Sequence, residues 1–131
     1  MRSVFFAAMF TGLYILASTY GGRIEGRLFP VVVDVTIDRT EAVDSISSRL
    51  WGRFRKVREC NFVEIEFFLG SPNKSAAVSV TLEEGSKLRG NGIEEWGPWV
   101  VQLTGAQLQG IFYAVVTHDC HPFWKTKTIF Y

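Results

Sequence analysis

The sequence predicts an all-β domain preceded by one N-terminal transmembrane helix. Three observations carry this prediction: an uncharged apolar run at the N-terminus, an alternation of apolar and polar residues in much of the remaining chain, and two cysteines. The chain has 131 residues, of which 47% are hydrophobic and 15% aromatic. This composition excludes a disordered chain, and the length suits one folded domain rather than two with separate cores.

The N-terminal apolar run extends from Val4 to Tyr20 and contains neither charge nor proline. As a helix rising 1.5 Å per residue it would span roughly 25 Å, near the lower limit for crossing a bilayer. Residues 1–22 are therefore expected to be a membrane anchor that contacts lipid through residues 4–20. The alternatives are a cleaved signal peptide, with Ala17-Ser18-Thr19 as a weak cleavage site, and a buried helix of a soluble protein.

The segment from Gly21 to Leu28 is expected to be a short linker, and the folded domain is assigned to residues 23–131. After the linker, apolar residues recur at every second position, which is the period of a half-buried strand. The apolar face of this predicted strand comprises Val31, Val33, Val35 and Ile37. The polar stretch from Arg39 to Ser45 is expected to connect it to the next strand.

The same alternation predicts strands over Leu50–Val57 and Phe62–Leu69. In the second of these, the inward-facing residues would be Val63, Ile65, Phe67 and Leu69. If the chain reverses tightly between the two strands, both faces agree on one register. The cross-strand pairs of that register would be Arg55 with Glu64, Arg53 with Glu66, and Phe54 with Ile65.

The rest of the chain continues the β pattern. Gly70-Ser71-Pro72-Asn73 is a strong turn signal, followed by one alternating strand over residues 76–82. A loop is expected from Glu83 to Glu95. The last strands are expected around Trp99–Leu103, Ile111–His118 and Lys125–Phe130, with a break from Gly105 to Gly110. About seven short strands favour an immunoglobulin-like β-sandwich, with a small barrel as the alternative. The cysteine–tryptophan–cysteine spacing of true immunoglobulin domains is absent.

Cys60 and Cys120 bear on the compartment. In an exported domain two cysteines are expected to pair, so we predict a disulfide whose Cα atoms lie roughly 4.4–6.8 Å apart. The protein would then be a single-pass membrane protein with its C-terminal domain outside the cytoplasm, either periplasmic or extracellular. The alternative is a metal-binding or metal-delivery domain that uses His118, Cys120 and His121, with Cys60 as a fourth ligand.

The balance of charges argues against nucleic-acid binding, because 14 basic side chains face 13 acidic ones. No serine lies in a Gly-x-Ser-x-Gly frame, and the glycines from Gly85 to Gly92 do not follow the order of a phosphate-binding loop. We therefore expect no enzymatic activity and no cofactor. An envelope hydrolase is a further alternative, and it would need a histidine and a carboxylate together in one pocket.

A domain without catalytic residues is expected to act by binding a protein partner. The predicted partner-binding surface is the loop from Gly85 to Trp99 together with two later aromatics. Its candidate residues are Lys87, Arg89, Trp96, Trp99, Phe123 and Trp124. The alternative is that the tryptophans are core residues, as large aromatics usually are.

One basic cluster stands out, and either of two roles suits it. Its members are Arg49, Arg53, Arg55, Lys56 and Arg58. They could contact anionic lipid headgroups near a membrane anchor. Pairing with acidic neighbours on an exposed sheet face is the favoured interpretation, since such pairs are common on strands.

Three short motifs carry a resemblance to a group of proteins. They are Arg58-Glu59-Cys60-Asn61-Phe62, Trp96-Gly97-Pro98-Trp99, and Cys120-His121-Pro122-Phe123-Trp124 followed by residues 126–131. Together they resemble small, uncharacterised membrane-anchored proteins of tailed bacteriophages and prophages. The resemblance covers a little over half of the chain and brings no activity or site residues. It implies a location in the bacterial envelope and a role in host interaction.

Overall fold

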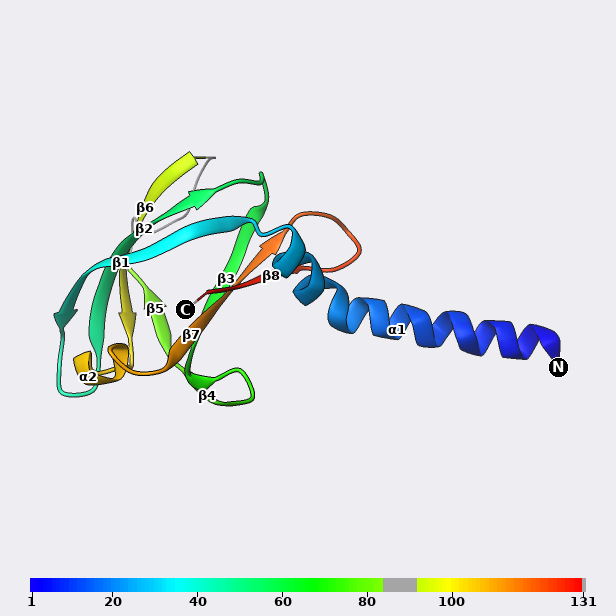
Figure 1. The fold of residues 1–131 in the computed structure, drawn as a ribbon, viewed down its shortest axis with the longest axis horizontal. Helices are drawn as coiled ribbons and strands as arrows, with labels where there is room; N and C mark the ends of the chain where they lie inside the picture. The colour runs from blue at the N-terminus through cyan, green and yellow to red at the C-terminus, as the bar shows by residue number, and fades with distance from the viewer. Residues whose placement is uncertain (84–91, 131) are drawn as a thin grey trace.

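A computed structural model describes residues 1–83 and 92–130, and within them the chain forms an N-terminal helix and two antiparallel four-stranded sheets (Figure 1). The first sheet has the order β1 (Val32–Ala42), β2 (Ser48–Lys56), β6 (Gly92–Val101) and β5 (Val80–Leu82). The second has the order β4 (Lys74–Val78), β3 (Asn61–Ser71), β7 (Phe112–Asp119) and β8 (Thr126–Phe130). The prediction of an all-β domain after an N-terminal helix is confirmed.

The N-terminal helix α1 extends from Arg2 to Leu28, so the prediction of a linker over residues 21–28 is wrong. Residues 1–20 are exposed, and α1 is the one helix among the described residues that is long and apolar enough to cross a membrane. Figure 1 shows it projecting from the two-sheet domain as a stalk. Its last two turns rest on β8, where Gly22 and Gly26 are buried.

Glycine is needed at these two helix positions because the backbones of α1 and β8 come very close. A Cβ atom at Gly22 would collide with the carbonyl oxygen of Lys125, and one at Gly26 would collide with that of Lys127. The helix therefore lies against an edge strand and covers it, which also shields that edge from pairing with another chain. This contact explains why the helix continues past the apolar run.

The two sheets share one hydrophobic core between their inner faces. The first sheet contributes Leu50, Phe54, Trp96, Trp99 and Val101, and the second contributes Ile65, Phe67, Phe112, Ala114 and Val116. The ring of Phe67 meets the edge of Trp99 across the core, with centroids 6.5 Å apart. The alternation read from the sequence correctly placed Val31 and Phe54 inward, because period 2 follows directly from strand geometry.

The predicted hairpin between residues 50–57 and 62–69 does not form. β2 pairs with β1 and β6, whereas β3 pairs with β4 and β7, so the two strands belong to different sheets. The connection between them lacks the Asn-Gly or Asp-Gly signal of a tight hairpin and crosses from one sheet to the other. In addition, the pairing of β3 with β7 shifts register between Phe62 and Glu64, which leaves Val63 40% exposed instead of buried.

Other boundaries differ from the sequence prediction. Of the polar stretch expected to connect strands, residues 39–42 are the end of β1, which continues to Ala42, and residues 43–45 lie in the connection to β2. The single strand expected over residues 76–82 divides at Ser79, with β4 in one sheet and β5 in the other. β6 begins at Gly92, inside the expected loop. The turn at residues 70–73 is confirmed, and the break at 105–110 holds a short helix, α2 (Gly105–Leu108), capped by Thr104.

Candidate functional site: the helix–domain junction

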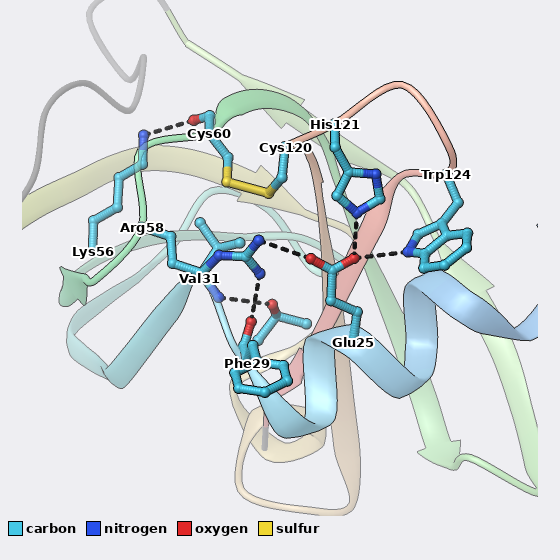
Figure 2. Close-up of a disulfide and its surroundings, with 10 residues drawn as sticks. Glu25, Phe29, Val31, Lys56, Arg58, Cys60, Cys120, His121 and Trp124 are labelled. Carbon is cyan, nitrogen blue, oxygen red and sulfur yellow. Dashed lines mark hydrogen bonds and ion pairs between the residues drawn. A yellow bond between two sulfur atoms is a disulfide. The ribbon is translucent and has the colours of Figure 1, made fainter.

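The predicted pairing of Cys60 with Cys120 is present in the structure. The two residues form a disulfide with their Cα atoms 4.6 Å apart. Cys60 lies directly before β3 and Cys120 directly after β7, which are neighbours in one sheet. The bond therefore ties the 57–60 connection to the 120–125 connection, on the side of the domain where α1 arrives (Figure 2).

Next to the disulfide, Glu25 of α1 reaches into the domain and accepts three hydrogen bonds. Arg58 Nη2 donates to Glu25 Oε1 at 2.8 Å, while His121 Nε2 and Trp124 Nε1 both donate to Oε2 at 2.7 Å. Figure 2 shows these three side chains converging on the carboxylate from both connections. The Glu25 side chain is only 13% exposed. We call Glu25, Arg58, His121 and Trp124 the Glu25 cluster.

The end of the helix is fixed by the same arginine. Arg58 Nη1 donates to the carbonyl oxygen of Phe29 at 2.8 Å, immediately after α1 ends at Leu28. A guanidinium is favourable there, because the last carbonyl groups of a helix lack partners and carry partial negative charge. Arg58 thus holds both a side chain and the backbone of the helix terminus.

The Glu25 cluster keeps its carboxylate ionised. Burial raises the pKa of Glu25, but the hydrogen bonds from His121, Arg58 and Trp124 outweigh it and lower the pKa from 4.5 to about 2. A carboxylate with this pKa and three donors has neither a proton to give nor a free oxygen aimed at a substrate. The arrangement fits a structural connection between helix and domain.

The ring of His121 is also held by hydrogen bonds within the protein. Its Nδ1 accepts the backbone N–H of Phe123 at 3.3 Å, so the proton of a neutral ring lies on Nε2, which donates to Glu25. Both ring nitrogens are used within the protein. The Glu25–His121 pair resembles part of a catalytic dyad in residue type, but no serine, threonine or cysteine nucleophile is bonded to His121 among the described residues.

The four residues of the alternative metal site do not come together as ligands. The two thiols are consumed by the disulfide, His121 is bonded to Glu25, and His118 is fully buried with no hydrogen-bond partner for either ring nitrogen. In residues 1–83 and 92–130 no three His, Cys, Asp or Glu side chains gather where they could hold a metal ion. Burial, with Lys56 and Arg58 nearby, lowers the pKa of His118 to about 4.

The basic cluster predicted from the sequence is engaged within the protein. Its ion-pair partners are Glu83 for Arg49, Asp38 for Arg53, Asp34 for Arg55 and Glu25 for Arg58. Lys56 is buried and donates to the carbonyl oxygen of Cys60 at 2.8 Å. The favoured interpretation, pairing with acidic neighbours, is confirmed for the four arginines.

The predicted partner-binding tryptophans belong to the core. Trp96 and Trp99 are 3% and 2% exposed and stack with ring centroids 4.3 Å apart. Residues three apart in a regular strand would face opposite ways. Here Trp99 lies opposite Leu50 and Trp96 lies opposite Gly52, so β6 has one more residue than β2 between these two pairs. This bulge turns both rings inward. The proposed loop thus loses its aromatic anchor, and Lys87 and Arg89 lie outside the described residues.

The two remaining candidates, Phe123 and Trp124, lie beside α1. Phe123 is 75% exposed, whereas Trp124 packs its ring against the helix at Gly21, where a Cβ atom would come within 2.7 Å of it. Both residues therefore lie just beyond the end of the apolar run. Glu25 is not among the residues that the sequence predicts for a site, because glycines and charges in residues 21–28 favour a linker there. The available signal was the four-residue spacing of Gly22 and Gly26, which places two small residues on one helix face.

At the opposite end of the domain, the connection between β1 and β2 is organised by Asp44. Its Oδ1 accepts the backbone N–H groups of Ile46 and Ser47, both at 2.8 Å. Val43 and Ile46 point into solvent, 45% and 61% exposed. Figure 1 shows this connection and α2 together on the side of the domain away from α1, which we call the far end.

No protein-family model, curated protein or solved structure matches the chain. The function must therefore be argued from the geometry of the helix–domain junction and of the far end.

Proposed function

We propose that this protein is a single-pass envelope protein whose β domain lies outside the cytoplasm and binds a protein partner through its far end. The observation that carries the proposal is the continuity of α1, which runs without a break from the apolar segment at residues 4–20 into the Glu25 cluster. A helix joined to the domain in this way would hold the domain in one orientation above the membrane.

The compartment is supported by the disulfide and by the apolar helix. Disulfides form and persist in oxidising environments, and α1 carries an apolar segment of membrane-spanning length. These two features agree on a domain in the periplasm or outside the cell. The resemblance of three motifs to membrane-anchored phage and prophage proteins favours a bacterial envelope and a role in host interaction.

The strand order supports an immunoglobulin-like assignment. β1-β2-β6-β5 and β4-β3-β7-β8 correspond to strands A-B-E-D and C′-C-F-G of that sandwich. One feature differs: the disulfide here joins the ends of neighbouring strands in one sheet, whereas in antibody domains it joins the two sheets. The proposed immunoglobulin-like architecture would thus lack the family's cysteine framework.

The strand order also explains why the far end is the candidate binding surface. In antibody variable domains the connections B–C and F–G form the recognition surface. Here the corresponding connections, 57–60 and 120–125, carry the disulfide and bind α1. The connection at residues 43–47 has neither the disulfide nor a contact with α1, and it presents Val43 and Ile46 on an ordered backbone. Ordered apolar side chains at an exposed tip are suited to protein recognition, since little conformational entropy is lost on binding.

Site-specific photo-crosslinking in intact cells tests the proposal. A photoreactive phenylalanine analogue replaces Ile46 at the far end or Ile93 near the start of β6, which is equally apolar and 75% exposed but lies at the helix side. We expect a discrete crosslinked protein from position 46 and none from position 93. Carbonate extraction of the same cells should leave the protein in the membrane fraction. Release by carbonate, or identical crosslinks from both positions, would contradict the proposal.

A further inference from the structure

A second group of basic residues lies where α1 leaves the β domain, separate from the paired cluster described above. Arg23 and Arg27 lie four residues apart on α1, and Lys125 and Lys127 lie on one outward face at the start of β8. Among the described residues the side chains of Arg23, Arg27 and Lys127 form no hydrogen bond or ion pair, and that of Lys125 only meets Asp119 at 3.5 Å. We call these four residues the junction cations.

The junction cations line two adjoining cavities. One, of about 450 Å³, is lined by Arg23, Arg27 and Lys127. The other, of about 470 Å³, is lined by Arg23, Lys125 and Lys127 together with Tyr20 and Trp124. Glu66 is the acidic residue of a small neighbouring cavity that also includes Arg23 and Lys127, and it forms no ion pair within 4.0 Å with either of them. Within the described residues, no acidic side chain lines either of the two larger cavities, so both carry positive charge.

An apolar groove adjoins the second cavity. It has a volume of about 670 Å³, and Leu13, Leu16 and Ala17 line it on the side of the membrane segment. Tyr20 and Trp124 line both this groove and the basic cavity, so the two spaces meet at these aromatic rings. Tyrosine and tryptophan are the residues that favour the headgroup level of a bilayer. A positive cavity and an apolar groove that share two lining residues match a molecule with an anionic head and a hydrocarbon tail.

We propose that the junction cations bind the phosphate of an anionic phospholipid whose acyl chain lies in the groove along α1. This inference rests on the proposed function, because it needs the helix in a bilayer. Each Lys or Arg side chain near an anionic surface adds to the attraction, so four of them should favour an anionic lipid over a zwitterionic one. The bound lipid would add a second connection between helix and domain, on β8 rather than at the Glu25 cluster.

Native mass spectrometry of the full chain, delipidated in detergent micelles, tests the site. Phosphatidylglycerol and phosphatidylcholine with identical acyl chains are titrated against the wild type, the double variant Arg23→Gln/Lys127→Gln, and a charge-matched control, Arg55→Gln/Lys74→Gln. We expect the wild type and the control to bind phosphatidylglycerol at least about tenfold more tightly than phosphatidylcholine, and the junction variant to lose that preference. Equal preference in both double variants would overturn the proposal.

Two further measurements separate the possible failures. The headgroup without chains, glycerophosphoglycerol, should bind at least about tenfold more weakly than the intact lipid, and equal binding would reassign the site to a small soluble anion. Carbonate extraction of cells that express each variant should leave all of them in the membrane. Release of the wild type would overturn both the proposed function and the lipid site, whereas retention without lipid preference would overturn the lipid site alone.

Discussion

The two ends of the β domain are held together in opposite ways. The connection at residues 120–125 is ordered from outside, by the disulfide and by side chains that bond to Glu25 of the helix. The connection at residues 43–47 is ordered from within, by the carboxylate of Asp44. At the helix side the polar side chains of the connection bond to the helix. At the far end the apolar side chains of Val43 and Ile46 are exposed to solvent. The helix side is therefore built for attachment, which leaves the far end for the proposed recognition of a partner.

The largest effect on stability is expected from removing the disulfide, which lies at the helix side. The double change Cys60→Ser/Cys120→Ser opens a loop spanning 60 residues in sequence, which should lower the free energy of unfolding by about 4 kcal/mol. Urea unfolding of the full chain in micelles measures the loss. Reduction of the wild type should reproduce it. A loss below about 1 kcal/mol would show that the helix side is stable without its covalent tie.

The next effect concerns the contact between helix and domain. Glu25→Ala leaves Arg58, His121 and Trp124 without their acceptor in a site where the carboxylate is only 13% exposed. Leaving three donors of a half-buried charged network without their acceptor should cost about 3 kcal/mol and should expose residues 22–29 to proteases. The control is Glu41→Ala, an exposed glutamate near the end of β1. Similar behaviour of the two variants would mean that the Glu25 cluster does not hold the helix.

The third prediction is a loss of stability in mild acid caused by His118. Its folded-state pKa of about 4 lies below the ordinary value of 6.5, so the unfolded chain binds the proton more readily. Stability is therefore complete above pH 6.5 and falls as the pH is lowered toward 4, by at most about 3 kcal/mol. His118→Leu should flatten the profile between pH 6.5 and 4.5. A variant that keeps the wild-type slope there would assign the loss to other groups.

The smallest effect is expected at the far end. Asp44→Ala removes the acceptor of two backbone N–H groups and should lower the stability only slightly, because Asp44 is exposed to solvent. Hydrogen exchange at Ile46 and Ser47 should become faster, while exchange at residues 120–125 stays unchanged. Asp44→Asn keeps an acceptor oxygen and should behave like the wild type. An effect of Asp44→Ala that spreads to the helix side would contradict the independence of the two ends.

The sequence predicted those features that depend on short-range pattern or on chemistry. Period-2 alternation placed Phe54 and Phe67 in the core, and the exported character of the chain predicted the disulfide. Pattern could not decide which strands pair, because β2 and β3 each present a face suited to either sheet. It also could not foresee the bulge that buries Trp96 beside Trp99, since that shift arises from pairing with β2.

The junction was the hardest part to predict. Residues 21–28 read as a linker because they combine glycines with charges, yet the glycines are there to let the helix backbone approach β8. The partners of Glu25 lie 33, 96 and 99 residues away in the sequence. Such a cluster becomes visible only when the fold brings the two connections together.

The most direct test of the central claim is amide hydrogen exchange of the full chain in lipid vesicles, read over residues 21–29. If α1 is one helix that holds the domain in a fixed orientation, protection continues without a gap from the apolar segment to Phe29, whose N–H bonds to the carbonyl oxygen of Glu25 at 2.7 Å. Glu25→Ala should remove that protection beyond residue 21. Exchange of residues 21–28 in the wild type as fast as in an unstructured peptide would contradict the account, because the domain would then hang on a flexible linker.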